Sequence, residues 1–516
     1  MIPYARYPGL SPLFLEFLAG LPEFYPDRPT VEAAAARGRQ LLAAGQPARV
    51  PASAFRCRSA EGRRMAEDLA AGRAVAVSAG HQVGLFTGPL FTLMKAFDAI
   101  HLARELSRRG VPAVPVFWAL TDDHDLQEIA HTARPTPEGP QELILEGADR
   151  QNRQPVGRLP IPEGVRPIVE AFRPDARDED AAWVLDACAA RSAPGTHYGE
   201  AFIETLLDLV DPDPLLVIDP LGASQRAPTV ALFLEAAGKE QALRAALRAT
   251  AEALKASGRP IPAPVPEGFS FFAIDGEGRR RIEDVPGAVR RVEAGEAWPS
   301  ADVITRPILK SYLFPMAASV LGAAEIAYHA QSLPLFPLFG VPAPVLIPRT
   351  HLVLRGPAER RLAEQLGIAE EDLLVAPAAE DAPSVPEADA VARLARETAD
   401  RLAAFHGPLQ SLDASLSGAL DTAGKKIAYQ FDQLADRARK AVERKGSVAA
   451  NRRKRLAQAL MPGGIPAERV YPPLAWTLAW GRGFPDALRS AAGASAEGAT
   501  VIDLGVDGPE GGAHAG

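Results

Sequence analysis

The chain has 516 residues, of which 47% are hydrophobic and 23% are charged, a composition typical of a soluble globular protein with about two to four structural units. Its net charge of −8 argues against a dedicated nucleic-acid binder, which usually carries a basic face. The only two cysteines, Cys57 and Cys188, exclude a disulfide framework and a Cys-rich zinc site, and they fit a reducing compartment such as the cytoplasm.

Neither a secretory signal nor a membrane helix is predicted. Residues 1–6 lack a basic start followed by an apolar run. The most apolar stretch, 333–348, contains five prolines, whereas a membrane helix needs about 20 apolar residues in succession. We therefore expect no membrane partner. The Gly/Ala-rich end of the chain, 491–516, is expected to be a flexible tail.

A strand–loop–helix–strand unit opens the predicted core. The Val-rich run 73–79 fits a buried strand, and a glycine-punctuated loop follows it. A helix is predicted from Pro89 to Arg109, because proline is favoured in the first helical turn, and 111–120 fits the next buried strand. This order indicates an α/β fold with a parallel sheet, in which ligands bind at the carboxyl ends of the strands.

Later segments predict two further parts. Strands are expected at 215–219 and 270–274, and the turn residues at 275–278 predict a hairpin over 269–282 that belongs to an inserted subdomain at about 225–300. Apolar residues at three- and four-residue steps then predict a helical coiled-coil domain over 386–450.

That coiled-coil domain is expected to contain one long helix. Gly407-Pro408 interrupts the apolar pattern, and a helix from Pro408 to Lys445 would be about 57 Å long at about 1.5 Å per residue. The predicted division is therefore a core over 1–385, the helical domain, and a segment over 451–490 that returns to the core.

The first candidate site is the loop from Gly80 to Gly88. Its glycines would let backbone approach a phosphate, and the following helix N-terminus would supply free N–H groups. The candidate ligands in and after this loop are Gly80, His81, Gln82, Gly84, Thr87, Gly88 and Lys95. Thr87 could instead cap the helix. A purely structural turn explains the loop equally well.

The second candidate is the run Asp122-Asp123-His124-Asp125 at the end of the second strand. Ionisable side chains after a buried strand are costly unless they line a cleft or are paired. They could bind Mg²⁺, act as acid–base groups or hold a substrate ammonium. The alternative is a capped helix over 126–130 with an acidic first turn.

The third candidate lies between Arg306 and Arg349. Both arginines could clamp a carboxylate or phosphate, although a lone arginine more often forms a surface or structural ion pair. Glu325 and Tyr328 follow the small residues 322–324, which would permit close approach of a ligand. Both could also be ordinary helix residues.

These segments together resemble the cysteine-adding enzymes of bacillithiol biosynthesis, the BshC family. The stretches that carry the resemblance are GHQVGLFTGPLFTLMK, PVFWALTDDHDLQEI, RPILKSYLFPMAASVLGAAEIAYHAQ, PVLIPR and LMPGGIPAERVYPPLAW, in that order. The resemblance spans roughly residues 1–482. Ala323-Ala324 stand where the family usually has Pro-Gly.

The resemblance implies a Rossmann-like, nucleotidyltransferase-type core, a connecting subdomain and a coiled-coil domain that forms a homodimer. It implies an adenine nucleotide, ATP or bound ADP, with or without Mg²⁺. The implied activity joins cysteine to the amine of glucosaminyl-malate after ATP activates the cysteine carboxylate. His81 and the glycine loop would then stabilise phosphate charge, the Asp122–Asp125 carboxylates would hold or deprotonate an amine, and Arg306 or Arg349 would suit malate.

Two other functions remain open from the sequence. The Asp-Asp-His-Asp run with His81 could form a divalent-metal hydrolase centre, although no dedicated metal ligand set is predicted. A coiled-coil scaffold that binds nucleotide without turnover is the second alternative. The sequence does not decide between AMP and ADP as product, which carboxylate is the base, or whether a second nucleotide site exists.

Overall fold

The fold is described from a computed structural model. It describes residues 1–149, 151–264, 269–375, 386–413, 415–443, 448–493 and 497–505. The chain forms two compact units, one of Met1–Pro357 with Pro462–Gly516 and the other of Ala358–Met461. The second unit thus begins before residue 386, where the helical domain was predicted to start.

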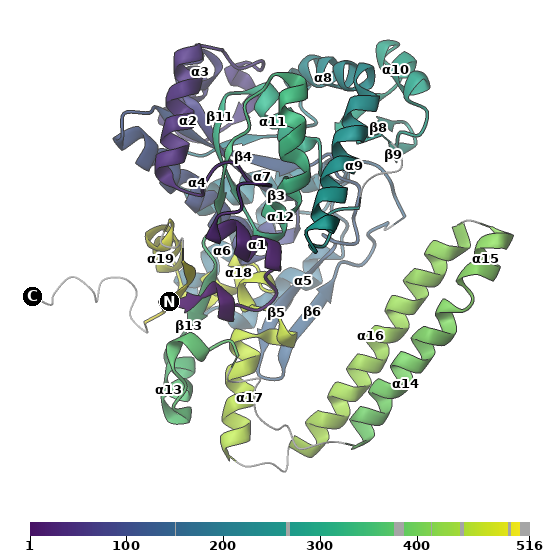
Figure 1. Cartoon of the computed structure of the whole chain (residues 1–516). Coiled ribbons are helices and arrows are strands. Elements are labelled where there is room, and N and C mark those ends of the chain that lie inside the picture. The colour runs from purple at the N-terminus through teal and green to yellow at the C-terminus, as the bar shows by residue number, and fades with distance from the viewer. Residues whose placement is uncertain are drawn as a thin grey trace, which may run out of the picture. The chain divides into compact units, whose positions relative to one another are not determined.

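A six-stranded sheet organises the first unit (Figure 1). All neighbouring strands are parallel except the edge strand β2, which runs antiparallel to β7. In spatial order the strands are β12 (Val345–Pro348), β11 (Met316–Leu321), β3 (Val75–Gln82), β4 (Ala113–Leu120), β7 (Leu216–Ile218) and β2 (Phe55–Arg56). The chain leaves β3 toward β4 and later returns to its other side as β11, so the loops after β3 and β11 diverge where an α/β sheet binds ligands. The predicted α/β, Rossmann-like class is confirmed.

Strand β3 is buried on both faces, as expected of a central parallel strand. Val75 and Val77 pack into one core with α4 (Leu90–Arg108), and Ala76 packs into the other core with α11 (Arg306–Leu313). The strand extends through Gly80, His81 and Gln82, which pair with β4, so these residues are not in the loop where the sequence placed them. The helices of the first unit up to β7 are α1 (Pro12–Ala19), α2 (Val31–Ala44), α3 (Ala60–Ala70), α4, α5 (Val165–Phe172), α6 (Glu179–Arg191) and α7 (Tyr198–Val210).

The segment between β7 and α11 forms a small α/β layer of its own. Its antiparallel sheet has the order β10 (Trp298–Ala301), β8 (Phe271–Asp275), β9 (Gly278–Arg281), and the hairpin predicted over 269–282 is confirmed. The helices are α8 (Arg226–Gly238), α9 (Glu240–Ala256) and α10 (Val285–Glu293). Buried Phe271 joins this layer to the core that contains Ala76 and α11, which brings β9 close to the carboxyl end of β4.

The predicted flexible tail is partly wrong. Helix α19 (Gly483–Ala491) reaches into the tail, and strand β14 (Gly498–Asp503) pairs with β1 (Ile2–Pro3) and β13 (Leu352–Arg355). Backbone pairing on both sides fixes β14, although glycine and alanine dominate this part of the sequence. Residues 494–496 and 506–516 of the predicted tail lie outside the described residues. The unit also contains α12 (Ala323–Ser332), α18 (Pro473–Trp480) and the hairpin of β5 (His131–Thr136) and β6 (Gly139–Ile144).

The second unit is helical, as predicted. Its helices are α13 (Pro357–Leu366), α14 (Pro386–Ala403), α15 (His406–Leu412), α16 (Ser415–Glu443) and α17 (Val448–Leu460). Ala388, near the start of α14, packs against Ala435, near the end of α16, so the two helices are antiparallel (Figure 1). The single helix predicted from Pro408 is wrong, because Asp413 is extended and its carboxylate accepts a hydrogen bond from the backbone N–H of Ser415. Across the described ranges no helix is long and apolar enough to cross a membrane.

Candidate functional site

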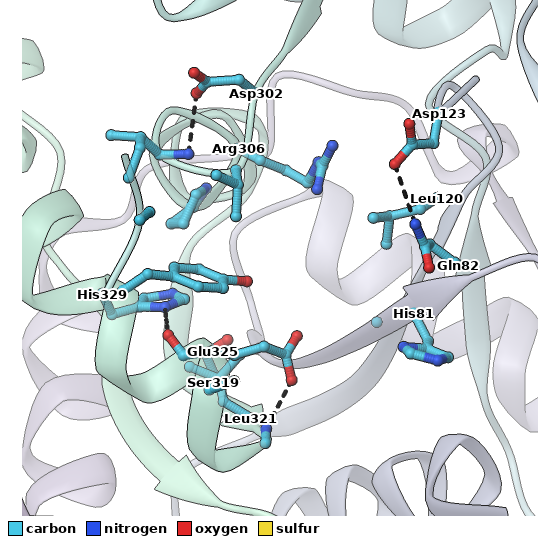
Figure 2. A pocket seen from close by; sticks show the side chains of 18 of the residues that line it. His81, Gln82, Leu120, Asp123, Asp302, Arg306, Ser319, Leu321, Glu325 and His329 are labelled. Atoms are coloured by element: carbon cyan, nitrogen blue, oxygen red, sulfur yellow. Dashed lines mark hydrogen bonds between the residues drawn. The ribbon is translucent and has the colours of Figure 1, made fainter. Parts of the chain in front are cut away.

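A cavity of about 1230 Å³ lies in the first unit, at the carboxyl ends of β3, β4 and β11. Figure 2 shows that His81 and Gln82 from β3, Asp123 after β4, Arg306 from α11 and Glu325 from α12 surround it. The three sequence-predicted candidate regions therefore meet in one place. Of the predicted site residues, those that line the cavity are Gly80, His81, Gln82, Lys95, Asp123, His124, Asp125, Arg306, Glu325, Tyr328 and Arg349.

An ion pair joins two helices at the cavity wall. The Lys95 ammonium lies 2.5 Å from the Glu325 carboxylate and donates a hydrogen bond to the Gly80 carbonyl. Glu325 also accepts a hydrogen bond from the N–H of Gly322, at the start of α12. Burial opposes ionisation of Glu325, but the Lys95 charge and these hydrogen bonds lower its pKa to about 2. Glu325 is therefore a fixed anion and Lys95 its counter-ion.

His81 is an uncharged side chain of this site. Burial first and the charge of Lys95 second lower its pKa to about 3. Its ring packs edge-on against Phe91, with 4.9 Å between the ring centroids. A neutral imidazole can donate a hydrogen bond to a phosphate or carboxylate oxygen, and its weak basicity makes it a poor proton acceptor at neutral pH.

The Asp122–Asp125 run is held by the neighbouring layer. The guanidinium of Arg279, on β9, donates hydrogen bonds to Asp123 (3.2 Å) and to Nδ1 of His124 (3.0 Å). Ser300, on β10, donates a hydrogen bond of 2.6 Å to Asp122, which is buried behind the cavity wall. These contacts offset part of the cost of placing ionisable groups after a buried strand, while Oδ1 of Asp122 has no hydrogen-bond partner among the described residues.

The charges around Asp123 keep it ionised. Burial alone would raise the pKa of its carboxyl, but the hydrogen bond of 2.7 Å from the backbone N–H of His124 and the charges of Arg279 and Arg306 hold it well below its usual range. Gln82 adds a hydrogen bond of 3.4 Å. Within the described ranges, no three His, Cys, Asp or Glu side chains are grouped as metal ligands.

Asp125 occupies the exposed rim. Its carboxylate accepts backbone N–H groups of Gln127 and Glu128, which is turn-capping chemistry. The helix considered at 126–130 is a turn instead.

Arg306 is a cation that faces the cavity without an anionic partner among the residues described. Among the described residues its guanidinium makes one hydrogen bond, a long one of 3.4 Å to the carbonyl of Ala301, and Nε is buried without a partner. Figure 2 shows its side chain extending from α11 into the space before Asp123. An unpaired guanidinium in a cavity suits a phosphate or carboxylate.

Arg349 forms a structural ion pair, one of the two roles that the sequence left open for it. Its guanidinium makes two hydrogen bonds, of 2.7 and 2.9 Å, to the carboxylate of Glu468, and both side chains are buried. The pKa of Arg349 is raised because the Glu468 charge outweighs burial, which alone would lower it. Arg349 borders the cavity, but both of its terminal nitrogens are hydrogen-bonded to Glu468, which favours a structural ion pair over a substrate clamp.

The part of the glycine loop from Gly84 to Gly88, a candidate phosphate site, makes structural contacts. Thr87 is fully buried with φ of 71°, and its hydroxyl donates to the carbonyl of Phe86. The prediction that Thr87 caps the helix is wrong, since Pro89 holds the N-cap position and no side chain caps it. Gly84 and Gly88 approach each other closely and lie outside the cavity lining, as Thr87 does.

Tyr328 and His329 complete the wall formed by α12. Burial and the Glu325 charge raise the pKa of Tyr328, so it remains a phenol. Burial lowers the pKa of His329 to about 4, and its Nδ1 lies 2.7 Å from the carbonyl of Glu325. Neither residue is ionised at neutral pH.

The sequence interpretation missed Arg279, Ser300 and Lys310. Alternation on β9 could have indicated the first, because three consecutive arginines must divide between two faces. Arg279 and Arg281 line the cavity, whereas Arg280 binds the carboxylate of Asp275. Lys310, on α11, lines the cavity as well, and the helical periodicity of 306–313 carried no sign that distinguished it.

Comparisons with known proteins agree with this architecture. The model of the N-terminal Rossmann-like domain of the bacillithiol biosynthesis protein BshC matches residues 49–350, and that of the BshC C-terminal coiled-coil domain matches 360–504. Together these matches span the sheet, the cavity and the helical unit.

Curated relatives are similar along most of their length. The chain is 29% identical to a protein named "Putative cysteine ligase BshC" from Thermus thermophilus, over 83% of this chain and 88% of that one. Proteins of the same name from Koribacter versatilis and Geobacillus thermodenitrificans are 27% and 28% identical, over 82% and 77% of this chain and 83% and 78% of their own. The chain therefore belongs to the BshC family of bacillithiol biosynthesis.

Proposed function

We propose that this chain is a cysteine ligase, which joins L-cysteine to the amino group of glucosaminyl-malate after ATP activates the cysteine carboxylate. The names of the relatives and the membership of the BshC family support the reaction class. The charges of the cavity also support the proposal. A single cavity at the carboxyl edge of the Rossmann-like sheet combines the open cation Arg306 with fixed anions, of which Asp123 and Glu325 are two.

The charges suit the substrates in this scheme. A carboxylate is a poor electrophile, so conversion to an acyl phosphate or acyl adenylate must precede attack by an amine. Arg306 would bind the transferred phosphate or a malate carboxylate, and neutral His81 would donate a hydrogen bond to the same charge as it develops. Mg²⁺ would accompany the nucleotide through its phosphates. Acidic side chains at the rim, Asp125 and Glu128, suit the ammonium of cysteine.

The activation step has a direct test. Cysteine labelled with ¹⁸O in its carboxylate should transfer one label to the phosphorus product during turnover. Label in AMP identifies an acyl adenylate, and label in inorganic phosphate identifies an acyl phosphate. Product formation without label in either would contradict activation of the carboxylate. Arg306→Met should weaken nucleotide or acceptor binding, and Arg280→Met, on the outer face of β9, is the matched control.

We also propose that the protein acts in the cytoplasm as a homodimer formed through the helical unit. Two cysteines without a disulfide, Cys57 and Cys188, fit a reducing compartment. Large apolar side chains exposed on α14–α16 support a partner surface; they are Leu394, Phe405, Leu412, Leu416, Tyr429 and Leu434. Light scattering should give twice the chain mass, and Leu434→Glu with Tyr429→Glu should yield monomer. A monomeric wild type would contradict the dimer.

A further inference from the structure

Lys310 is a buried amine of the cavity that the contacts described above do not use. It lies on α11 and is 8% exposed. No residue that the structure describes forms a hydrogen bond or ion pair with its Nζ, which lies 5.7 Å from the centre of the Trp118 ring. The free amine therefore faces the cavity that its side chain lines.

Lys95, the other buried lysine of the cavity, differs from Lys310 because it has an anionic partner. The two lysines lie on opposite sides of Gly80: Nζ of Lys95 donates to the Gly80 carbonyl, and a Cβ on Gly80 would lie 3.4 Å from Nζ of Lys310. Lys95 has the carboxylate of Glu325 at 2.5 Å, and Lys310 has no such partner. An ammonium that is buried without a counter-ion is destabilised relative to the neutral amine.

The surroundings of Lys310 also favour its neutral form. Burial lowers its pKa to about 7, the charge of Glu325 from α12 opposes this shift, and Arg306 on its own helix and Lys95 from α4 add to it. The histidines of the cavity wall, His81 from β3 and His329 from α12, are neutral because burial lowers their pKa values to about 3 and 4.

Two fixed carboxylates of the cavity wall, Glu325 and Asp123, are weaker bases than a neutral lysine amine. Glu325 is bound to Lys95 and to the N–H of Gly322. Asp123 is bound to Arg279, and Arg306 lowers its pKa further. General-base catalysis is most efficient when the pKa of the base lies near the working pH, and these fixed anions are far from that condition.

We infer that Lys310 is the catalytic base of the ligation step, which accepts the proton that the amino group of the acceptor must lose before it attacks the activated cysteine. The inference rests on the proposed function and assigns the proton transfer within it.

Neutral Nζ of Lys310 takes a proton from the acceptor ammonium, which gives a lysine ammonium and a free amine. The amine lone pair forms the C–N bond to the cysteinyl carbonyl, and the acyl C–O bond of the ATP-derived mixed anhydride breaks. Its electron pair leaves with the phosphate or AMP. The amide nitrogen releases its second proton to water, and Lys310 returns its proton to water before the next turnover.

Two substitutions separate a base from a positive charge. Lys310→Met removes both functions, whereas Lys310→Arg keeps the charge and removes the base, because arginine does not deprotonate in proteins. Both should lower kcat by about 100-fold or more, with KM for ATP and cysteine changed by less than about threefold. Lys255→Met, which removes an exposed lysine from α9, is the matched control and should retain wild-type rates.

Two further readouts exclude a merely structural role. The wild-type kcat should fall on acidification with an apparent pKa near 7, and this limb should be absent from the residual activity of Lys310→Met. Ethylamine added to Lys310→Ala should restore activity in proportion to its unprotonated fraction, which a folding defect would not allow.

The outcomes distinguish the two proposals. If wild-type protein forms no cysteinyl amide, the proposed function fails and this inference fails with it. If wild-type protein forms the product and Lys310→Arg retains its rate within about threefold, the ligase stands and Lys310 is not the base. Loss of activity in both variants with amine rescue supports the inference.

Discussion

The carboxylate of Glu325 lies 2.5 Å from the ammonium of Lys95, and this pair joins α12 to α4 beside Gly80. Lys95 is almost fully buried, whereas Glu325 keeps about a quarter of its side chain exposed, at 26%. The ion pair thus links the helix that follows β3 to the helix that follows β11. The pair fixes the charge of the cavity wall in which His81 and Lys310 lie.

Removing one charge of the Lys95–Glu325 pair should lower the free energy of unfolding more than removing both charges. Lys95→Met leaves the Glu325 carboxylate uncompensated and should lower the free energy of unfolding by about 3 kcal/mol. Adding Glu325→Gln to it should recover at least half of that loss. Urea unfolding of the two variants measures the difference. A double variant less stable than Lys95→Met would contradict the pair.

The Arg279 contact predicts a contrast between neighbouring residues. Arg279→Met should remove the cation that holds Asp123 and His124 and lower kcat/KM by about tenfold or more, because a mispositioned group loses preorganisation. Arg280→Met, on the other face of β9, should leave kcat/KM unchanged. Steady-state kinetics with circular dichroism measures both. Equal losses in the two variants would contradict a positioning role.

Buried neutral histidines predict acid sensitivity. Burial lowers the pKa of His329 to about 4, whereas the unfolded chain has a value of about 6.5, so the unfolded state binds the proton first as pH falls. The stability contribution is therefore complete above about pH 6.5 and is lost as pH falls toward 4. In this window His329→Gln should reduce the slope of unfolding free energy against pH by up to about 1.4 kcal/mol per unit. An unchanged slope would contradict a neutral His329.

Gly80 predicts a steric test. A Cβ at this position would lie 2.8 Å from the carbonyl oxygen of Trp118, which belongs to the paired strand and cannot move away. Gly80→Ala should therefore lower the free energy of unfolding by about 1–3 kcal/mol. Gly424→Ala in α16, where nothing lies within 4 Å, is the control and should not destabilise. Thermal unfolding of both variants compares them.

The sequence could predict the placement of the site but not all of its contacts. The order of strands and the polar residues after them locate the cavity, because parallel strands align their carboxyl ends. The contacts of Arg279 with Asp123 and of Arg349 with Glu468 join residues 156 and 119 positions apart, and single-sequence periodicity carries no sign of them. Thr87 was misassigned because its positive φ depends on the packing of the loop.

The most direct measurement is mass spectrometry of purified protein incubated with glucosaminyl-malate, cysteine, ATP and Mg²⁺. We expect the cysteinyl amide of glucosaminyl-malate, formed only when ATP is present and reduced by about 100-fold in Lys310→Met. The Lys255→Met control should form the same product at the wild-type rate. Folded wild-type protein that binds nucleotide and forms no amide would contradict the ligase.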